Sequence, residues 1–115
     1  MFLKVIVLIL SLQTLISLNI DSGEYSTSYA WNSGHYMVTG TGYRSVEGYI
    51  RFSAGFQSTP KVTTSLDRID ADKNNNLRID CSAKDVTRSG FTISIITWAD
   101  SKIYGAACSW IAHGN

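Results

Sequence analysis

Apolar residues recur at every second position in several segments of this chain, and this period of two constrains the fold more than any other feature. The segment 76–84 has four apolar residues on one parity, Leu77, Ile79, Cys81 and Ala83. Successive side chains of a β-strand point to opposite faces of a sheet, so the pattern predicts a strand with one buried face. The same parity directs Arg78 away from the core.

Further segments show the same alternation, namely 46–52, 62–66, 91–98 and the approximate range 102–112. Trp98 has the outward parity of its segment, whereas Tyr104 shares parity with Cys108 and Trp110, which places Tyr104 inside unless a β-bulge redirects it. Short turns join the segments and no helical stripe follows residue 20, so we expect an all-β antiparallel sandwich. Its predicted core contains Leu77, Phe52, Phe91, Ile93 and Trp110.

The segments between the predicted strands have polar, turn-forming compositions. The range 26–42 is rich in Ser, Thr, Gly and aromatic residues and is expected to be a loop-rich connection. The run 74–76 consists of three asparagines and is expected to form a hairpin turn, because Asn tolerates left-handed backbone geometry. We expect three acidic residues before this turn to line a solvated loop; they are Asp67, Asp70 and Asp72.

Length and charge narrow the classes of function. A chain of 115 residues fits one small domain. The chain has ten basic and nine acidic residues. Removal of residues 1–19 takes away Lys4 and leaves nine residues of each sign. A neutral chain offers no basic surface for nucleic acid or anionic lipid.

The N-terminus has the pattern of a secretory signal peptide. Lys4 precedes an apolar stretch over 5–12, which the polar pair Gln13 and Thr14 interrupts too early for a membrane span. We expect cleavage between residues 17 and 21, so that 1–19 is a signal peptide and 20–115 is a secreted domain with no membrane span.

Cys81 and Cys108 are the only cysteines, and an even pair in an exported protein usually closes a disulfide. Both fall on apolar faces of their predicted strands, so their sulfur atoms can meet inside the sandwich.

A zinc site would need two more ligands, and His35 and His113 stand at no recognisable ligand spacing. The segment 70–74 resembles the start of a calcium loop but lacks its glycine and terminal glutamate. We expect a disulfide and no metal or other cofactor.

No pattern for catalysis stands out. A catalytic nucleophile needs a base within hydrogen-bond reach, and neither histidine lies in such a motif. Glycoside hydrolysis needs a pair of carboxyl groups, for which Asp67, Asp70, Asp72 and Asp80 are available. A small secreted hydrolase is the least favoured hypothesis, and we predict that the chain is not an enzyme.

The segment 90–104 carries a more informative combination. Trp98 and Tyr104 flank a short polar turn, and Arg78 points outward from a neighbouring strand. Sugars present an apolar C–H face surrounded by hydroxyl groups, so a sugar site needs an exposed aromatic ring beside fixed hydrogen-bond groups. Trp98 supplies such a ring, and the guanidinium of Arg78 supplies rigid donors for vicinal hydroxyls.

The order and spacing of several short motifs resemble the H-type lectin family. They are Ile50-Arg51-Phe52, Pro60-Lys61-Val62, Ser65-Leu66, Asn76-Leu77-Arg78, Gly90-Phe91, Thr97-Trp98, Lys102-Ile103-Tyr104 and Ser109-Trp110-Ile111, with Ser22-Gly23 near the start of the mature chain. The resemblance implies a six-stranded antiparallel β-sandwich. It also implies a parallel trimer that binds N-acetylgalactosamine or galactose, without metal, in clefts between protomers.

The resemblance further implies that Arg78 contacts the sugar, Trp98 stacks on it and Tyr104 forms an aromatic wall. Ala99 departs from the family, because the corresponding position in a snail agglutinin is a histidine that helps to fix the sugar. The family also places a glycine and an acidic residue in an upstream loop, here 40–44, which contains no acid. Two hypotheses follow: a secreted, oligomeric lectin with glycan or glycoprotein partners, or an assembly module of the same fold that has lost sugar binding.

Overall fold

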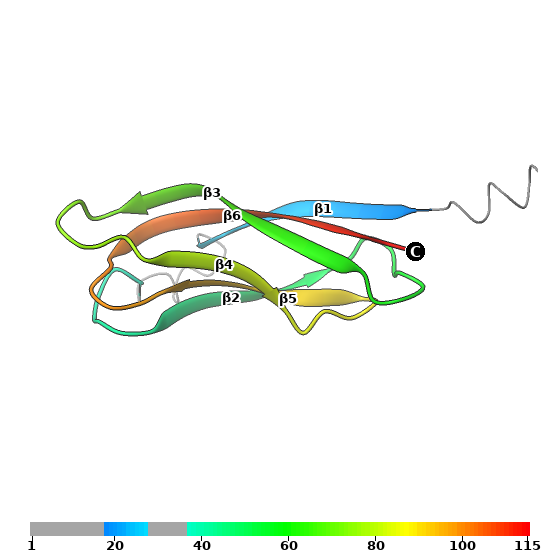
Figure 1. Ribbon diagram of the computed structural model, residues 1–115, viewed down its shortest axis with the longest axis horizontal. Helices are drawn as coiled ribbons and strands as arrows, with labels where there is room; N and C mark the ends of the chain where they lie inside the picture. Colours follow the sequence, from blue (N-terminus) through cyan, green and yellow to red (C-terminus); the bar gives the residue numbers. More distant parts are fainter. Residues whose placement is uncertain (1–17, 28–36) are drawn as a thin grey trace, which may run out of the picture.

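The computed structural model describes residues 18–27 and 37–115, which form two antiparallel sheets of three strands each. The strands are β1 (Asn19–Ser26), β2 (Arg44–Arg51), β3 (Lys61–Ala71), β4 (Ile79–Lys84), β5 (Gly90–Thr97) and β6 (Ile103–Gly114). One sheet has the order β1-β6-β3 and the other β2-β5-β4. The sheets lie face to face (Figure 1), which confirms the predicted six-stranded sandwich.

Two sequence-based expectations concern segments that the structure covers only in part. The predicted signal peptide at 1–19 and most of the loop predicted for 26–42 lie outside the described residues. In the described ranges, no helix has the length and apolar character needed to cross a membrane.

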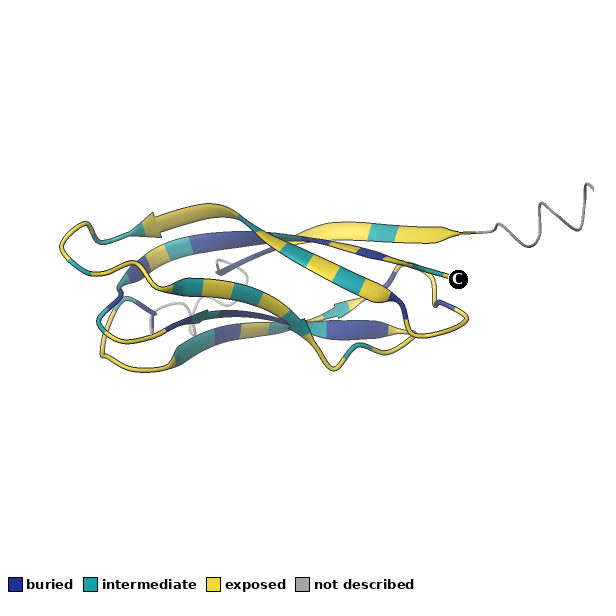
Figure 2. Ribbon diagram, viewed as in Figure 1, coloured by how far each residue is buried: buried dark blue, intermediate teal, exposed yellow. Residues whose placement is uncertain are grey.

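The period of two reappears as alternating burial along the strands (Figure 2). The buried core between the sheets includes Val46, Phe52, Phe91, Ile93, Ile95, Ile103 and Trp110. Four of the core rings form a cluster in which neighbouring ring centroids lie 5.0–6.0 Å apart; they belong to Phe52, Phe56, Phe91 and Trp110. Four of the five predicted core residues are therefore buried as expected.

A glycine permits one of the closest contacts between the two sheets. A Cβ atom added to Gly48 of β2 would lie 2.5 Å from the ring of Tyr25, which comes from β1 in the other sheet. Because any side chain at this position would displace the ring, Gly48 fixes how closely the sheets approach at this point.

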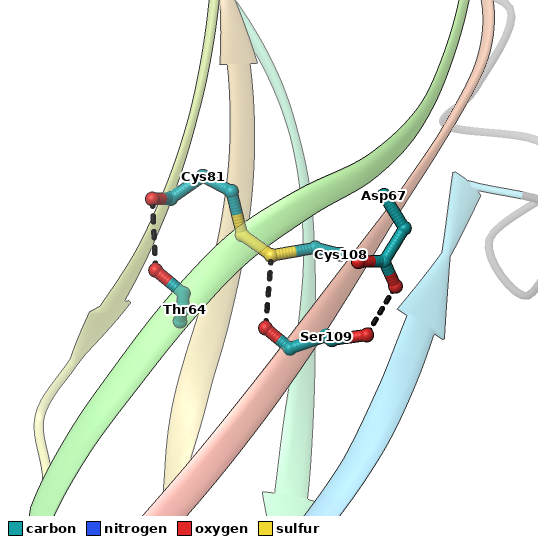
Figure 3. Close-up of a disulfide and its surroundings, with 5 residues drawn as sticks. All are labelled: Thr64, Asp67, Cys81, Cys108 and Ser109. Atoms are coloured by element: carbon teal, nitrogen blue, oxygen red, sulfur yellow. Dashed lines mark hydrogen bonds between the residues drawn. A yellow bond between two sulfur atoms is a disulfide. The ribbon is translucent and has the colours of Figure 1, made fainter.

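The predicted disulfide is present and joins the two sheets. Cys81 of β4 and Cys108 of β6 are linked across the core, with their Cα atoms 6.6 Å apart (Figure 3). The hydroxyl of Thr64 donates to the Cys81 carbonyl at 3.0 Å, so β3 is held to β4 beside the bridge. On the other side, the Ser109 hydroxyl donates to the Asp67 carboxylate.

Leu77 is the predicted core residue that proved wrong. Its side chain is 57% exposed and precedes β4, because the backbone of this segment is bonded to the β5–β6 connection instead of continuing the strand. The Asn74–Asn76 run does not form a hairpin within one sheet, since it connects β3 in one sheet to β4 in the other. The predicted solvated loop is also wrong: β3 continues through Asp67 and Asp70, and only Asp72 follows it.

Two register shifts interrupt the pairing of β3 with β6, and the second decides where Tyr104 points. Asp70 pairs with Gly105 but Ala71 pairs with Ile103, so Tyr104 is an extra residue in β6. Such a bulge reverses the alternation of a strand. Ile103 is therefore 1% exposed and Tyr104 is 55% exposed, so the β-bulge that was the stated exception to parity is present and turns Tyr104 away from the core.

Candidate functional site

Three connections lie together at one end of the sandwich (Figure 1, left). They are the segment before β2, the β3–β4 connection and the β5–β6 connection. The Gly42 amide donates to the Ala99 carbonyl at 2.9 Å, and the Asp72 amide donates to the Lys102 carbonyl at 2.9 Å. The connection after β5 is thus bonded to the other two.

Trp98 immediately follows β5 and is 38% exposed, in agreement with its outward parity. Ala99, which comes next, has φ = 57°, a left-handed conformation that residues with a Cβ rarely adopt. The chain therefore turns sharply just after Trp98 and leaves part of its indole in solvent.

Arg78 and Trp98 each lie one position beyond the last pair of the β4–β5 ladder, which is Ile79 with Thr97. Both residues are outside the strands. The Arg78 amide donates to the Ser101 hydroxyl at 2.8 Å, and its carbonyl accepts from the Thr97 hydroxyl at 2.5 Å. Both hydroxyl-bearing residues are fully buried. The backbone of Arg78 is thus held on both sides, while its exposed guanidinium makes no hydrogen bond or ion pair within the described residues.

Asp100 holds the β3–β4 connection against the β5–β6 connection. Its carboxylate accepts from the backbone and the side chain of Asn76, both at 3.4 Å. The Asn76 backbone N–H holds the pKa of the Asp100 carboxyl below its ordinary value. Asp100 therefore stays charged at neutral pH and keeps the segment before Arg78 in place.

Tyr104 lies at the same end but belongs to the other sheet. Its hydroxyl donates to the Asp72 carboxylate at 3.1 Å, and this hydrogen bond raises the pKa of Tyr104. Because Asp72 begins the connection that ends at Arg78, Tyr104 and Arg78 border the same loop. No direct contact joins Tyr104 to Trp98 among the interactions of the described residues.

Sequence patterns did not reveal the residues that support this site. Asp100 and Ser101 lie in the polar turn next to Trp98, and that proximity was the only signal for them. Arg44, which follows an upstream loop, donates to several backbone carbonyls, including that of Ala99. Nothing in the alternation of β2 distinguishes Arg44 from any other strand arginine.

The exposed groups suit a ligand that combines an apolar face with hydrogen-bond acceptors. An indole face and a free guanidinium offer stacking and hydrogen-bond donation, and a phenol lies nearby. The described ranges contain no cluster of three or more His, Cys, Asp or Glu side chains arranged to hold a metal ion.

Comparison with known proteins gives a family match. The H-type lectin domain matches residues 48–113, more than half of the chain. A protein of Fuscovulum blasticum described as ATP synthase subunits region ORF 7 is 32% identical over 99 residues, which are 86% of each chain. A discoidin-1 polypeptide of Dictyostelium discoideum is 35% identical over 77 residues, which are 66% of this chain.

Comparison with solved structures shows a shared fold. The structure of recombinant discoidin II of Dictyostelium discoideum superposes with a TM-score of 0.74 over 87% of this chain, at 24% identity. The match covers 39% of that discoidin II chain and 30% of the discoidin-1 polypeptide. The chain therefore spans well under half the length of the discoidins it resembles.

Proposed function

The chain belongs to the H-type lectin domain family, and on this premise we propose that it is a non-catalytic lectin for terminal galactose or N-acetylgalactosamine. One observation carries the proposal. The exposed Trp98 and Arg78 each lie one position beyond the Ile79–Thr97 pair that ends the β4–β5 ladder. The Arg78 guanidinium is unpaired in the described structure, and its backbone is held by Thr97 and Ser101.

Each proposed contact has a physical reason. The apolar face of a galactose ring stacks on the Trp98 indole, and the Arg78 guanidinium donates to adjacent hydroxyls. Tyr104 forms a wall at the side of the site. The backbone of Arg78 is already fixed, so sugar binding needs to order little more than the Arg78 side chain. The entropic cost of binding is therefore smaller than it would be for a mobile segment.

We also propose that the protein is secreted, after removal of residues 1–19, and forms a trimer or a multiple of three with sites between protomers. A disulfide supports export, because such bonds persist in oxidising compartments. Two exposed isoleucines on the outer face of β1-β6-β3, Ile20 and Ile111, support a contact between protomers. Several shallow sites on one oligomer hold a glycan-bearing surface more tightly than any single site.

A glycan array probed with the purified mature protein, with and without chelator, tests the proposal. We expect binding to galactose or N-acetylgalactosamine termini that the chelator does not change. If protein that is shown to be folded and oligomeric binds no glycan on the array, the lectin proposal is overturned.

A second candidate is a non-catalytic assembly module that has lost sugar binding. Two observations favour it: Ala99 ends in a methyl group beside Trp98, and no acidic side chain lies in the upstream loop 40–44. Oligomerisation without glycan binding is its expected signature, so the same array combined with sizing separates the two candidates.

A further inference from the structure

All three nitrogen atoms of the Arg44 guanidinium donate hydrogen bonds to the protein itself. Arg44 is the first residue of β2, and its side chain donates to four backbone carbonyls. Nε donates to Gly42 at 2.9 Å, Nη1 to Thr39 at 3.1 Å and Met37 at 3.5 Å, and Nη2 to Ala99 at 3.0 Å. Three of these carbonyls belong to the segment 37–42, which precedes β2, and the fourth belongs to the turn after Trp98.

These hydrogen bonds to backbone carbonyls distinguish Arg44 from an arginine that binds a ligand. All three nitrogen atoms of its guanidinium are engaged, so no fork of donors is free for a ligand. In the described part of the chain the only ion pair joins Lys84 to Glu47, which means that backbone carbonyls rather than a carboxylate surround the Arg44 charge. Arg78, in contrast, has its backbone held and its guanidinium free.

The contact with Ala99 reaches the proposed site. Ala99 has φ = 57°, an unfavourable conformation for a residue with a Cβ. Its carbonyl accepts from Arg44 at 3.0 Å and from the Gly42 amide at 2.9 Å, so both donors that fix this peptide come from one short segment. Gly42 has φ = 80°, which a glycine adopts without strain. The two hydrogen bonds hold the peptide that follows Ala99 and offset the unfavourable backbone conformation of Ala99, the residue after Trp98.

We propose that Arg44 is a positioning residue of the sugar site: it joins the segment 37–42 to the turn at Ala99 and thereby fixes the orientation of Trp98. The inference rests on the proposed function, because it assigns Arg44 to the site that binds the sugar. Arg44 acts through the Ala99 carbonyl and touches no ligand.

The test uses two variants and a matched control. Arg44→Met keeps the length of the side chain and removes every donor, whereas Arg44→Lys keeps the charge and restores only part of the hydrogen bonding. The control is Asp21→Asn at the opposite end of the sandwich, where the Asp21 carboxylate accepts from the Ser53 amide at 2.8 Å. This control weakens a link between a side chain and a loop backbone without touching the proposed site.

Two measurements are made on each variant, with circular dichroism and an intact disulfide as evidence of folding. The first is galactose affinity, which we expect to fall about tenfold in Arg44→Met and less in Arg44→Lys. The second, without sugar, is the NMR signal of the Trp98 indole N–H, identified by its absence in Trp98→Phe. We expect it to shift or broaden in Arg44→Met and to stay unchanged in Asp21→Asn.

The outcomes separate this inference from the proposed function. Wild-type affinity and an unchanged Trp98 signal in a folded Arg44→Met protein would overturn the positioning role. A wild-type protein that binds no sugar, with a Trp98 signal that still depends on Arg44, would overturn the lectin proposal and leave the positioning role of Arg44 for Trp98 intact. Equal losses of affinity in Asp21→Asn and Arg44→Met would assign the effect to general destabilisation and would also overturn the inference.

Discussion

At the scale of single residues, the proposed site depends on side chains that a ligand would not touch. The buried hydroxyls of Thr97 and Ser101 satisfy the backbone of Arg78, and unsatisfied backbone groups in the same place would be costly. The segment before β4 therefore departs from the strand geometry that its sequence pattern predicts. The exposed Arg78 and Trp98 owe their positions to these buried partners.

Replacing Trp98 by Ala removes the proposed stacking surface. We expect sugar affinity to fall by about tenfold or more, because aromatic contacts of this kind contribute on the order of 1 kcal/mol beyond the area they bury. The free energy of unfolding should fall by about 1–2 kcal/mol without loss of the fold, since Trp98 is 38% exposed and the shielded part of its ring contributes to stability. Titration calorimetry and urea unfolding measure the two effects.

The matched control for this variant is Tyr49→Ala, which removes an exposed aromatic ring from β2, away from the proposed site. Its affinity should equal that of the wild type. Unchanged binding by Trp98→Ala would exclude Trp98 from the site.

Asp100 gives the site a predictable response to acid. Folding lowers the pKa of its carboxyl, so the charged form stabilises the connection above the ordinary Asp value, and this stabilisation is lost as the pH falls through the lowered value. Sugar affinity should therefore be flat from neutral pH down to about pH 5 and decline only in stronger acid. A binding titration across this range, compared with Asp100→Asn, measures the effect.

In Asp100→Asn the contacts with Asn76 weaken at every pH, so affinity should be lower throughout and its acid decline reduced. A wild-type affinity that already halves between pH 7 and pH 5 would contradict this assignment, because it would require a group with a higher pKa.

At the scale of elements, the strands that the sequence predicted best are those with a clear alternation. β5 lies where the period of two placed it, whereas β4 begins only at Ile79, inside the predicted segment 76–84. The pairing of Ile79 with Thr97 follows from antiparallel strands joined by a short turn. β1 gave no such signal, because only its last two residues, Tyr25 and Ser26, are buried. A strand with so little buried surface has no periodicity to detect.

Strand parity predicted the exposure of two of the three candidate site residues, although it failed for Leu77, the neighbour of Arg78. Parity placed Arg78 and Trp98 outward, as observed. It misplaced Tyr104, because the bulge depends on the register between β3 and β6, which local sequence does not specify. The role of Arg44 depends on carbonyl groups from distant segments, and every residue has a carbonyl, so no sequence pattern marks it.

The disulfide is the covalent link between the two sheets, and its removal should weaken the whole fold. The double variant Cys81→Ala/Cys108→Ala frees a chain segment of 27 positions in the unfolded state, which is expected to lower the free energy of unfolding by about 3 kcal/mol. Urea unfolding measures the difference. Adding reductant should destabilise the wild type and leave the double variant unchanged, and equal midpoints for the two proteins would contradict a stabilising bridge.

At the scale of the whole molecule, the outer faces of the two sheets differ in character. The outer face of β2-β5-β4 carries the Glu47–Lys84 ion pair, which spans its central strand above Ser94. The outer face of β1-β6-β3 instead presents Ile20 and Ile111 on adjacent strands, with Ser22 directly opposite Ile111. The β2-β5-β4 face also carries the exposed Tyr49, and the β1-β6-β3 face also carries the Ser109–Asp67 hydrogen bond, so the faces differ in their exposed isoleucines and not in charge alone. We propose the face with the isoleucines for contact with another protomer.

Replacing Ile111 by Asp places a charge on that second face and should dissociate the proposed trimer into monomers. Light scattering coupled to size exclusion should give a multiple of three for the wild type and one chain for the variant, whereas Tyr49→Asp on the other sheet should stay oligomeric. If the sites lie between protomers, Ile111→Asp must lose affinity for a single soluble sugar as well as for a multivalent surface, because part of each site departs with the neighbour. A monomer that keeps its affinity for the single sugar would show that one chain forms the whole site, and the contribution of oligomerisation would then be avidity alone.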